Sequence, residues 1–160
     1  MSHPSMGEAP RDMTAGFPAA AERIRAARAR IGARALEVAL ERDPSIRERH
    51  GELGMRKLLR DTEPLVDRVA IAVASNDATA VSSYADMVAP LYRRRRVPMD
   101  DLVHLCHGLK LAVPALLSPD EVGIAEQALD EAIRVFLWNR RIAGDARKRN
   151  RLLNAIYKGA

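Results

Sequence analysis

The chain has 160 residues, of which 48% are hydrophobic, 29% charged and 4% aromatic, and its formal net charge is +5. This length supports one domain with a hydrophobic core, and no apolar run approaches the roughly 18 residues that a membrane-spanning helix needs. The single cysteine, Cys106, excludes an internal disulfide framework and is typical of a reducing compartment, so we expect a cytoplasmic protein.

The first half of the chain predicts three helices. Residues 1–17 are rich in Pro, Gly, Ser and Met, show no periodicity and are expected to be disordered. Pro18 opens a helix whose apolar residues recur at helical spacing, and the sequence Asp-Pro-Ser at 43–45 ends it. A shorter helix is predicted over residues 46–60, and the sequence Asp-Thr-Glu-Pro at 61–64 predicts the start of another.

A further break is predicted at residues 75–77, where Asp77 can cap a fourth helix. That helix ends at four consecutive arginines, and the dipeptide Val97-Pro98 comes directly after them. We expect these arginines to contact a partner or phosphate groups. They are Arg93, Arg94, Arg95 and Arg96.

The helix predicted over residues 99–117 has two smooth faces. One face recurs at helical spacing and is expected to lie in the core; its members are Leu102, Leu105, Cys106, Leu109, Val113 and Leu116. The reverse face carries one polar residue among small or apolar ones, and its members are His104, Gly108, Leu111 and Ala115. Such a face commonly lies against another helix, and we predict that it forms the interface of a homodimer.

The sequence Ser-Pro-Asp-Glu at 118–121 is a capping box that predicts the start of the last and longest helix. The helical pattern weakens at residues 144–145. We therefore expect a helical regulatory domain over residues 18–143 and a basic amphipathic extension over residues 144–160. Residues 139–160 carry seven basic residues against one acid. The basic residues of the extension that we expect to contact a partner or phosphate groups are Arg147, Lys148, Arg149 and Arg151.

No segment shows the alternation of a β-strand, so five or six helices with short connections predict an all-α fold, either globin-like or a multi-helix antiparallel bundle. Within residues 65–117, one predicted helix ends near Asn76-Asp77, the next carries Tyr84, and the sequence Val-Pro-Met-Asp-Asp-Leu at 97–102 opens the helix after it. This pattern resembles the N-terminal sensor domains of RsbR-type stressosome proteins and related bacterial regulators. The resemblance extends loosely over residues 20–142, and it implies a globin-like, non-haem and usually dimeric domain.

On this basis we predict a non-enzymatic bacterial regulatory or sensor module that acts through protein–protein contacts, as a homodimer with a regulatory partner protein. One alternative is a nucleic-acid-binding protein that uses the arginine-rich clusters at 93–96 and 140–151. A second is a haem or tetrapyrrole sensor with a globin-like fold, in which His107 is the least implausible ligand. We expect no cofactor, and a membrane surface is not the expected partner.

No catalytic or metal site is predicted. His104, Cys106 and His107 are residue types that bind metals, but at helical spacing their side chains diverge. Cys106 is expected to be a small core residue instead of a redox nucleophile. Acidic neighbours such as Asp100 and Asp101 also point in different directions, which does not suit a general acid and base.

Overall fold

The computed structural model describes residues 15–157, with side chains for residues 15–142. Within this part of the chain there are six α-helices and one 3₁₀-helix, and no strand. In chain order they are α1 (Pro18–Ala26), α2 (Arg28–Arg42), α3 (Ser45–Ser75), α4 (Thr79–Arg94), α5 (Met99–Ala112), the 3₁₀-helix η1 (Pro114–Leu116) and α6 (Pro119–Tyr157). The all-α, globin-like class that the sequence predicts is confirmed.

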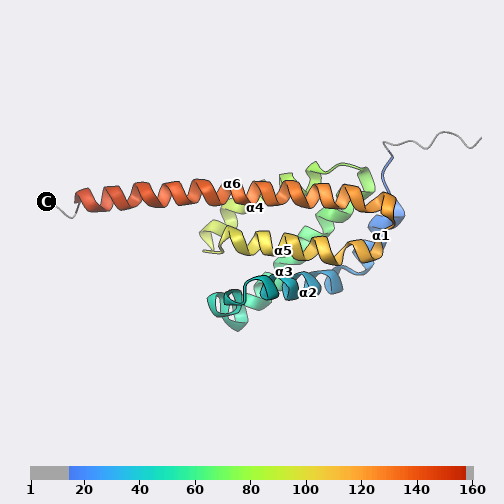
Figure 1. Ribbon diagram of the computed structural model, residues 1–160, viewed down its shortest axis with the longest axis horizontal. Helices are drawn as coiled ribbons and strands as arrows, with labels where there is room; N and C mark the ends of the chain where they lie inside the picture. Colours follow the sequence, from blue (N-terminus) through green and yellow to red (C-terminus); the bar gives the residue numbers. More distant parts are fainter. Residues whose placement is uncertain (1–14, 158–160) are drawn as a thin grey trace, which may run out of the picture.

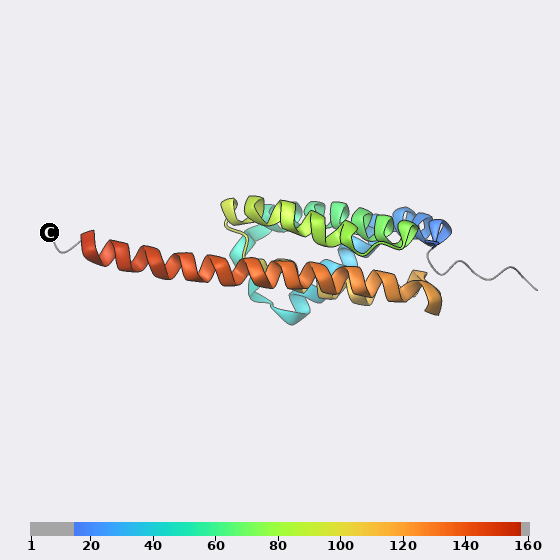
Figure 2. The same cartoon turned by 90° about the horizontal axis from the view of Figure 1, so that it is seen from above.

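The helices pack into one bundle around a shared core. Helix α5 contacts α2 and α6, α4 packs on α6 and α3, and α3 also contacts α1 and α2 (Figure 1). The core consists mainly of Ala, Val, Leu and Ile, and Phe136 is its largest fully buried side chain. Helix α6 runs on beyond the ends of the other helices, as Figure 2 shows.

The glutamate of the capping box predicted at the start of α6 makes its expected contact. The backbone N–H of Ser118 donates to Oε2 of Glu121 over 2.8 Å. Arg23 of α1 forms an ion pair with the same carboxylate and donates to the carbonyl of Leu116 over 2.9 Å. The hydrogen bond from Ser118, together with Arg23, holds the pKa of Glu121 below its usual range. These contacts tie α1 to the start of α6.

Two helices end earlier than the sequence pattern predicts. The helix that opens at Pro18 divides at Ala27, whose φ of −101° and ψ of 9° are not helical. Helix α5 ends at Ala112, and Pro114 begins η1 instead of continuing the helix. Phe17, inside the segment predicted to be disordered, packs on the core and donates its N–H to the carbonyl of Val73 over 2.9 Å.

The helix start predicted at residues 61–64 is wrong, because α3 continues through it. Thr62 is buried and donates its hydroxyl to the carbonyl of Leu58 over 2.9 Å, so it acts inside the helix and does not cap one. Pro64 is exposed, where the missing N–H leaves no buried group unsatisfied. The helix breaks instead at Gly51, whose φ of 63° suits a residue without a Cβ.

Helix α6 is continuous to Tyr157, and its backbone is not interrupted at residues 144–145, where the sequence pattern weakens. Residues 1–14 and the side chains of the predicted extension lie outside the described residues. The prediction that the extension contacts a partner or phosphate groups therefore concerns side chains outside the described residues. These are Arg147, Lys148, Arg149 and Arg151. Among the described helices, none combines the length and apolar character that crossing a bilayer requires.

Candidate functional site

A cavity of about 380 Å³ lies between the first half of α3 and the turn after α4. It is lined by Arg49, His50, Gly54, Lys57, Leu58, Arg95, Arg96 and Val97. Four of these residues are arginines or lysines, one is a histidine, and none is acidic. We call it the cationic cleft. Its volume falls within the range of about 300–1,000 Å³ that is typical of small-molecule sites.

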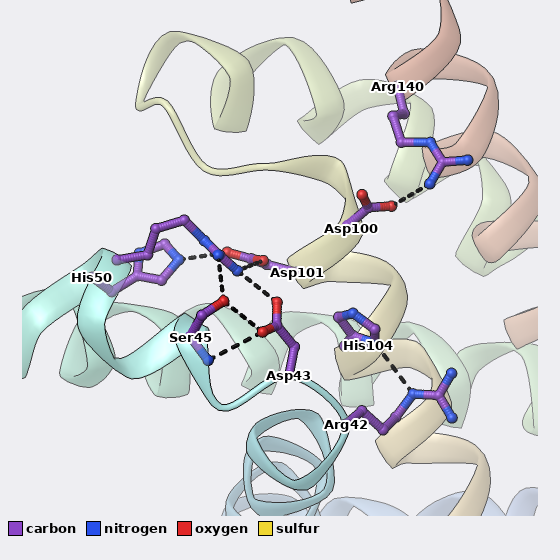
Figure 3. A network of polar contacts seen from close by, with 9 residues as sticks. Arg42, Asp43, Ser45, His50, Asp100, Asp101, His104 and Arg140 are labelled. Carbon is purple, nitrogen blue, oxygen red and sulfur yellow. Dashed lines mark hydrogen bonds and ion pairs between the residues drawn. The ribbon is translucent and has the colours of Figure 1, made fainter.

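A polar network fixes one wall of the cleft (Figure 3). Arg49 donates to Oδ1 of Asp101 over 2.7 Å and to Oδ2 of Asp43 over 2.9 Å. His50 lies next to the same aspartate, with 2.6 Å between its Nε2 and Oδ2 of Asp101. Asp101 is fully buried in the first turn of α5. The network therefore joins the N-terminal turns of α3 to α5.

Arg49 is neutralised by these carboxylates. Asp43 accepts a hydrogen bond from the hydroxyl of Ser45 and forms an ion pair with Arg49. These two contacts lower the pKa of Asp43 to about 2. Asp43 therefore stays ionised at neutral pH, and Arg49 retains both acidic partners. The charge of Arg49 orders the wall of the cleft and is not free for a ligand.

Arg95 is also paired. Its Nη2 lies 2.8 Å from Oδ2 of Asp61, and its guanidinium stacks over the ring of Tyr92, 5.4 Å from the centroid. The Asp61 oxygen is buried and accepts no well-aligned hydrogen bond among the described residues, so the contact with Arg95 is one of charge. The described residues provide no acidic partner for Lys57 or Arg96. These two cations are available to an anionic ligand.

Arg96 is held in an unusual backbone conformation. Its φ is 60°, and it follows the last turn of α4 at a position that glycine usually occupies. The N–H groups of Arg96 and Val97 donate to the carbonyls of Arg93 and Tyr92 over 3.1 and 2.9 Å. A left-handed arginine costs about 1–2 kcal/mol relative to its relaxed backbone. The helix end tolerates this strain and presents the guanidinium to the cleft.

The predicted arginine cluster divides between the cleft and its surroundings. Arg95 and Arg96 line the cleft, whereas Arg93 and Arg94 are exposed outside it. Lys57 was not identified from the sequence, because the segment around Gly51 predicts only a weak helix. The signal that could have identified Lys57 is the presence of basic residues on both sides of Gly51.

The four residues predicted to form a dimer interface do not share one exposed face. Arg42 donates through Nε to Nδ1 of His104 over 3.2 Å, and Gly108 is buried against α2 of the same chain. Leu111 and Ala115 remain exposed. Gly108 is therefore part of the intramolecular core, and of the four residues Leu111 and Ala115 are the ones left exposed, at the end of α5 and in η1.

The described residues contain no cluster of three or more His, Cys, Asp or Glu side chains that could hold a metal ion. His107 is partly buried, which lowers its pKa, and it does not line the cationic cleft. Cys106 is completely buried, and burial raises the pKa of its thiol to about 12. This thiol is protonated and shielded at neutral pH.

The chain is thus a globin-like helical protein with a cationic cleft on its bundle. A family model described as Phycobilisome protein matches residues 17–136, which is most of the chain. The chain belongs to the phycobilisome protein family. No curated protein and no solved structure gives a significant match.

This match corrects the resemblance to stressosome sensor domains and the functions drawn from it. The family comprises light-harvesting, bilin-binding proteins that form oligomers. A regulatory sensor module, a nucleic-acid-binding protein and a haem or tetrapyrrole sensor are therefore not supported. The resemblance rested on helix lengths and punctuation, which a shared globin-like fold reproduces without a shared function.

The cleft fits a bilin only in part. A bilin is an open-chain tetrapyrrole with two propionate groups, and Lys57 and Arg96 supply two unpaired cations beside the apolar residues Leu58 and Val97. A thioether link would require a reactive thiolate within reach of the pigment. Cys106 is buried and does not line the cleft. The residues present therefore suit non-covalent binding and do not suit covalent attachment.

Proposed function

We propose that this chain is a non-enzymatic subunit of the phycobilisome type that binds a bilin non-covalently in the cationic cleft. The observation that carries the proposal is the pair of unpaired cations, Lys57 and Arg96, beside apolar walls. Asp61 does not line the cleft, but it holds the guanidinium of Arg95, which does, over 2.8 Å. The proposed location is the cytoplasm, in keeping with the single buried cysteine.

Biliverdin is the probe for this proposal. We expect saturable binding of one biliverdin per chain, followed by the change in its visible absorbance. Replacement of Lys57 or Arg96 by Gln is expected to weaken binding about tenfold each, because each change removes one charge-assisted hydrogen bond to a propionate. Arg93→Gln and Arg94→Gln are matched controls from the same basic run outside the cleft, and they should leave the affinity unchanged.

The mode of attachment is tested in the same titration. Cys106→Ser should retain biliverdin binding, and denaturation in acidic urea should release all of the pigment from the original protein. Pigment that stays on the denatured chain would show a covalent bond and contradict this part of the proposal. If the original protein does not bind biliverdin, or if all four arginine and lysine variants bind equally well, the cleft is not a bilin site.

We propose further that the oligomer is a homodimer in contact through the end of α5. Leu111 is 67% exposed there, and Ala115 is exposed one turn further on. Burial of such an exposed apolar side chain against another protein removes it from water and is therefore favourable. Leu111→Arg is expected to shift the molar mass measured by light scattering from that of a dimer to that of a monomer. Leu53→Arg is a matched control, because Leu53 on α3 is also 67% exposed. An unchanged mass for Leu111→Arg would exclude this face.

A further inference from the structure

A second cavity, of about 670 Å³, lies between α2 and the first half of α3. We call it the apolar groove. Its lining consists of Ala33, Leu36, Glu37, Leu40, Arg47, Gly51, Glu52, Met55, Arg56 and Leu59. It shares no lining residue with the cationic cleft, although both use the same stretch of α3. The groove is therefore a separate site, and the helix break at Gly51 forms part of its wall.

The lining carries two arginines and two glutamates, and one of these arginines, Arg47, has no ion-pair partner in the described part of the chain. Glu52 pairs with Arg56 over 2.5 Å, and Glu37 pairs with Arg34 over 3.0 Å. The side chain of Arg47 has no acidic partner among the described residues. Beside it, the walls are provided by the apolar side chains of Leu36, Leu40, Met55 and Leu59. The groove thus combines an apolar wall with a single free guanidinium.

We infer that the apolar groove binds a long-chain carboxylate, a free fatty acid, with its head group on Arg47 and its alkyl chain along the apolar wall. Guanidinium and carboxylate form paired, charge-assisted hydrogen bonds. Each methylene removed from water strengthens binding about fourfold, so the chain supplies most of the affinity. A nucleotide or sugar phosphate carries more negative charge and more polar surface than this lining matches.

Palmitate, held below its micelle concentration, is the probe, and isothermal titration calorimetry measures its affinity. We expect one site per chain. Arg47→Gln should weaken binding about tenfold, because it removes the charged partner of the carboxylate. Leu59→Glu should weaken it further, since it places a negative charge on the apolar wall. The matched controls are Arg60→Gln and Leu53→Glu, two exposed positions of α3 outside the groove, and they should bind palmitate as the original protein does.

The head-group assignment has its own test. Methyl palmitate has the same chain without the charge, so it should bind the original protein more weakly than palmitate and be insensitive to Arg47→Gln. The Lys57→Gln and Arg96→Gln variants should keep full affinity for palmitate, which separates this site from the bilin proposal. Absence of saturable binding, or equal binding by Arg47→Gln and Arg60→Gln, would overturn the inference. Displacement of palmitate by biliverdin would assign the groove to the pigment, and a changed molar mass of Leu59→Glu would assign it to another protein chain.

Discussion

Gly108→Ala is expected to lower the free energy of unfolding by about 2–3 kcal/mol. A Cβ at Gly108 would lie 2.3 Å from the carbonyl oxygen of Ala35 and 2.6 Å from its Cα. Both atoms belong to the backbone of α2, which cannot rotate away as a flexible side chain can. The methyl group must therefore separate α2 from α5, and the loss extends to the core residues that this contact buries. Urea denaturation monitored by circular dichroism measures the change.

The control for this prediction is Gly123→Ala. Gly123 is an exposed residue inside α6, and a Cβ there would meet nothing within 4 Å. The same substitution is therefore expected to stabilise the protein by about 0.5–1 kcal/mol through helix propensity alone. If both variants changed stability by the same amount and in the same direction, close packing at Gly108 would not be the cause. An unchanged slope of the denaturation curve would show that the unfolded state is comparable.

Gly108 also shows what helical periodicity can and cannot predict. The spacing of side chains places Gly108 on a smooth face of α5 opposite the main core, and the structure covers this face at Gly108 but leaves Leu111 exposed. The element that covers Gly108 is α2 of the same chain, whereas the pattern alone predicts a second subunit there. Periodicity identifies a face that suits close packing, but the partner depends on how distant helices fold together.

Helix ends were predictable where the signal is local. The capping box at Ser118 involves residues three positions apart, and Glu121 reaches back to the predicted N–H. At residues 61–64 the same residue types lie inside α3, because burial of Thr62 and solvation of Pro64 make helix continuation acceptable. The division at Ala27 has no local signal, since alanine favours helix. Helix propensity alone would not predict a break at this position.

The cationic cleft could not be predicted as a unit. Its residues come from 49–58 and 95–97, and a single sequence gives no information on which helices become neighbours. The sequence predicts that the arginine cluster at 93–96 binds as a group. In the structure Asp61 pairs with Arg95, and the end of α4 decides which arginines line the cleft and which face solvent. The free cations of the cleft follow from those tertiary contacts.

Asp101→Ala is expected to destabilise the fold by about 3 kcal/mol, because it removes one partner from a buried ionic network and leaves the others uncompensated. Asp101 is fully buried and receives Arg49 on one carboxylate oxygen and His50 on the other. Its position in the first turn of α5 also places a negative charge at the positive end of the helix dipole. Thermal and urea denaturation measure the loss.

Asp100→Ala is the matched control, because Asp100 is the neighbouring residue of the same helix turn and forms an exposed ion pair with Arg140 over 2.7 Å. Solvent screens this pair, so its loss should cost less than about 1 kcal/mol. Equal effects of the two substitutions would mean that the helix terminus, and not the network, carries the stability. A large effect at Asp101 alone would show that the N-terminal turns of α3 are held through Arg49 and His50. Because those residues line the cationic cleft, Asp101→Ala should then weaken biliverdin binding even where the chain remains folded, although Asp101 itself does not line the cleft.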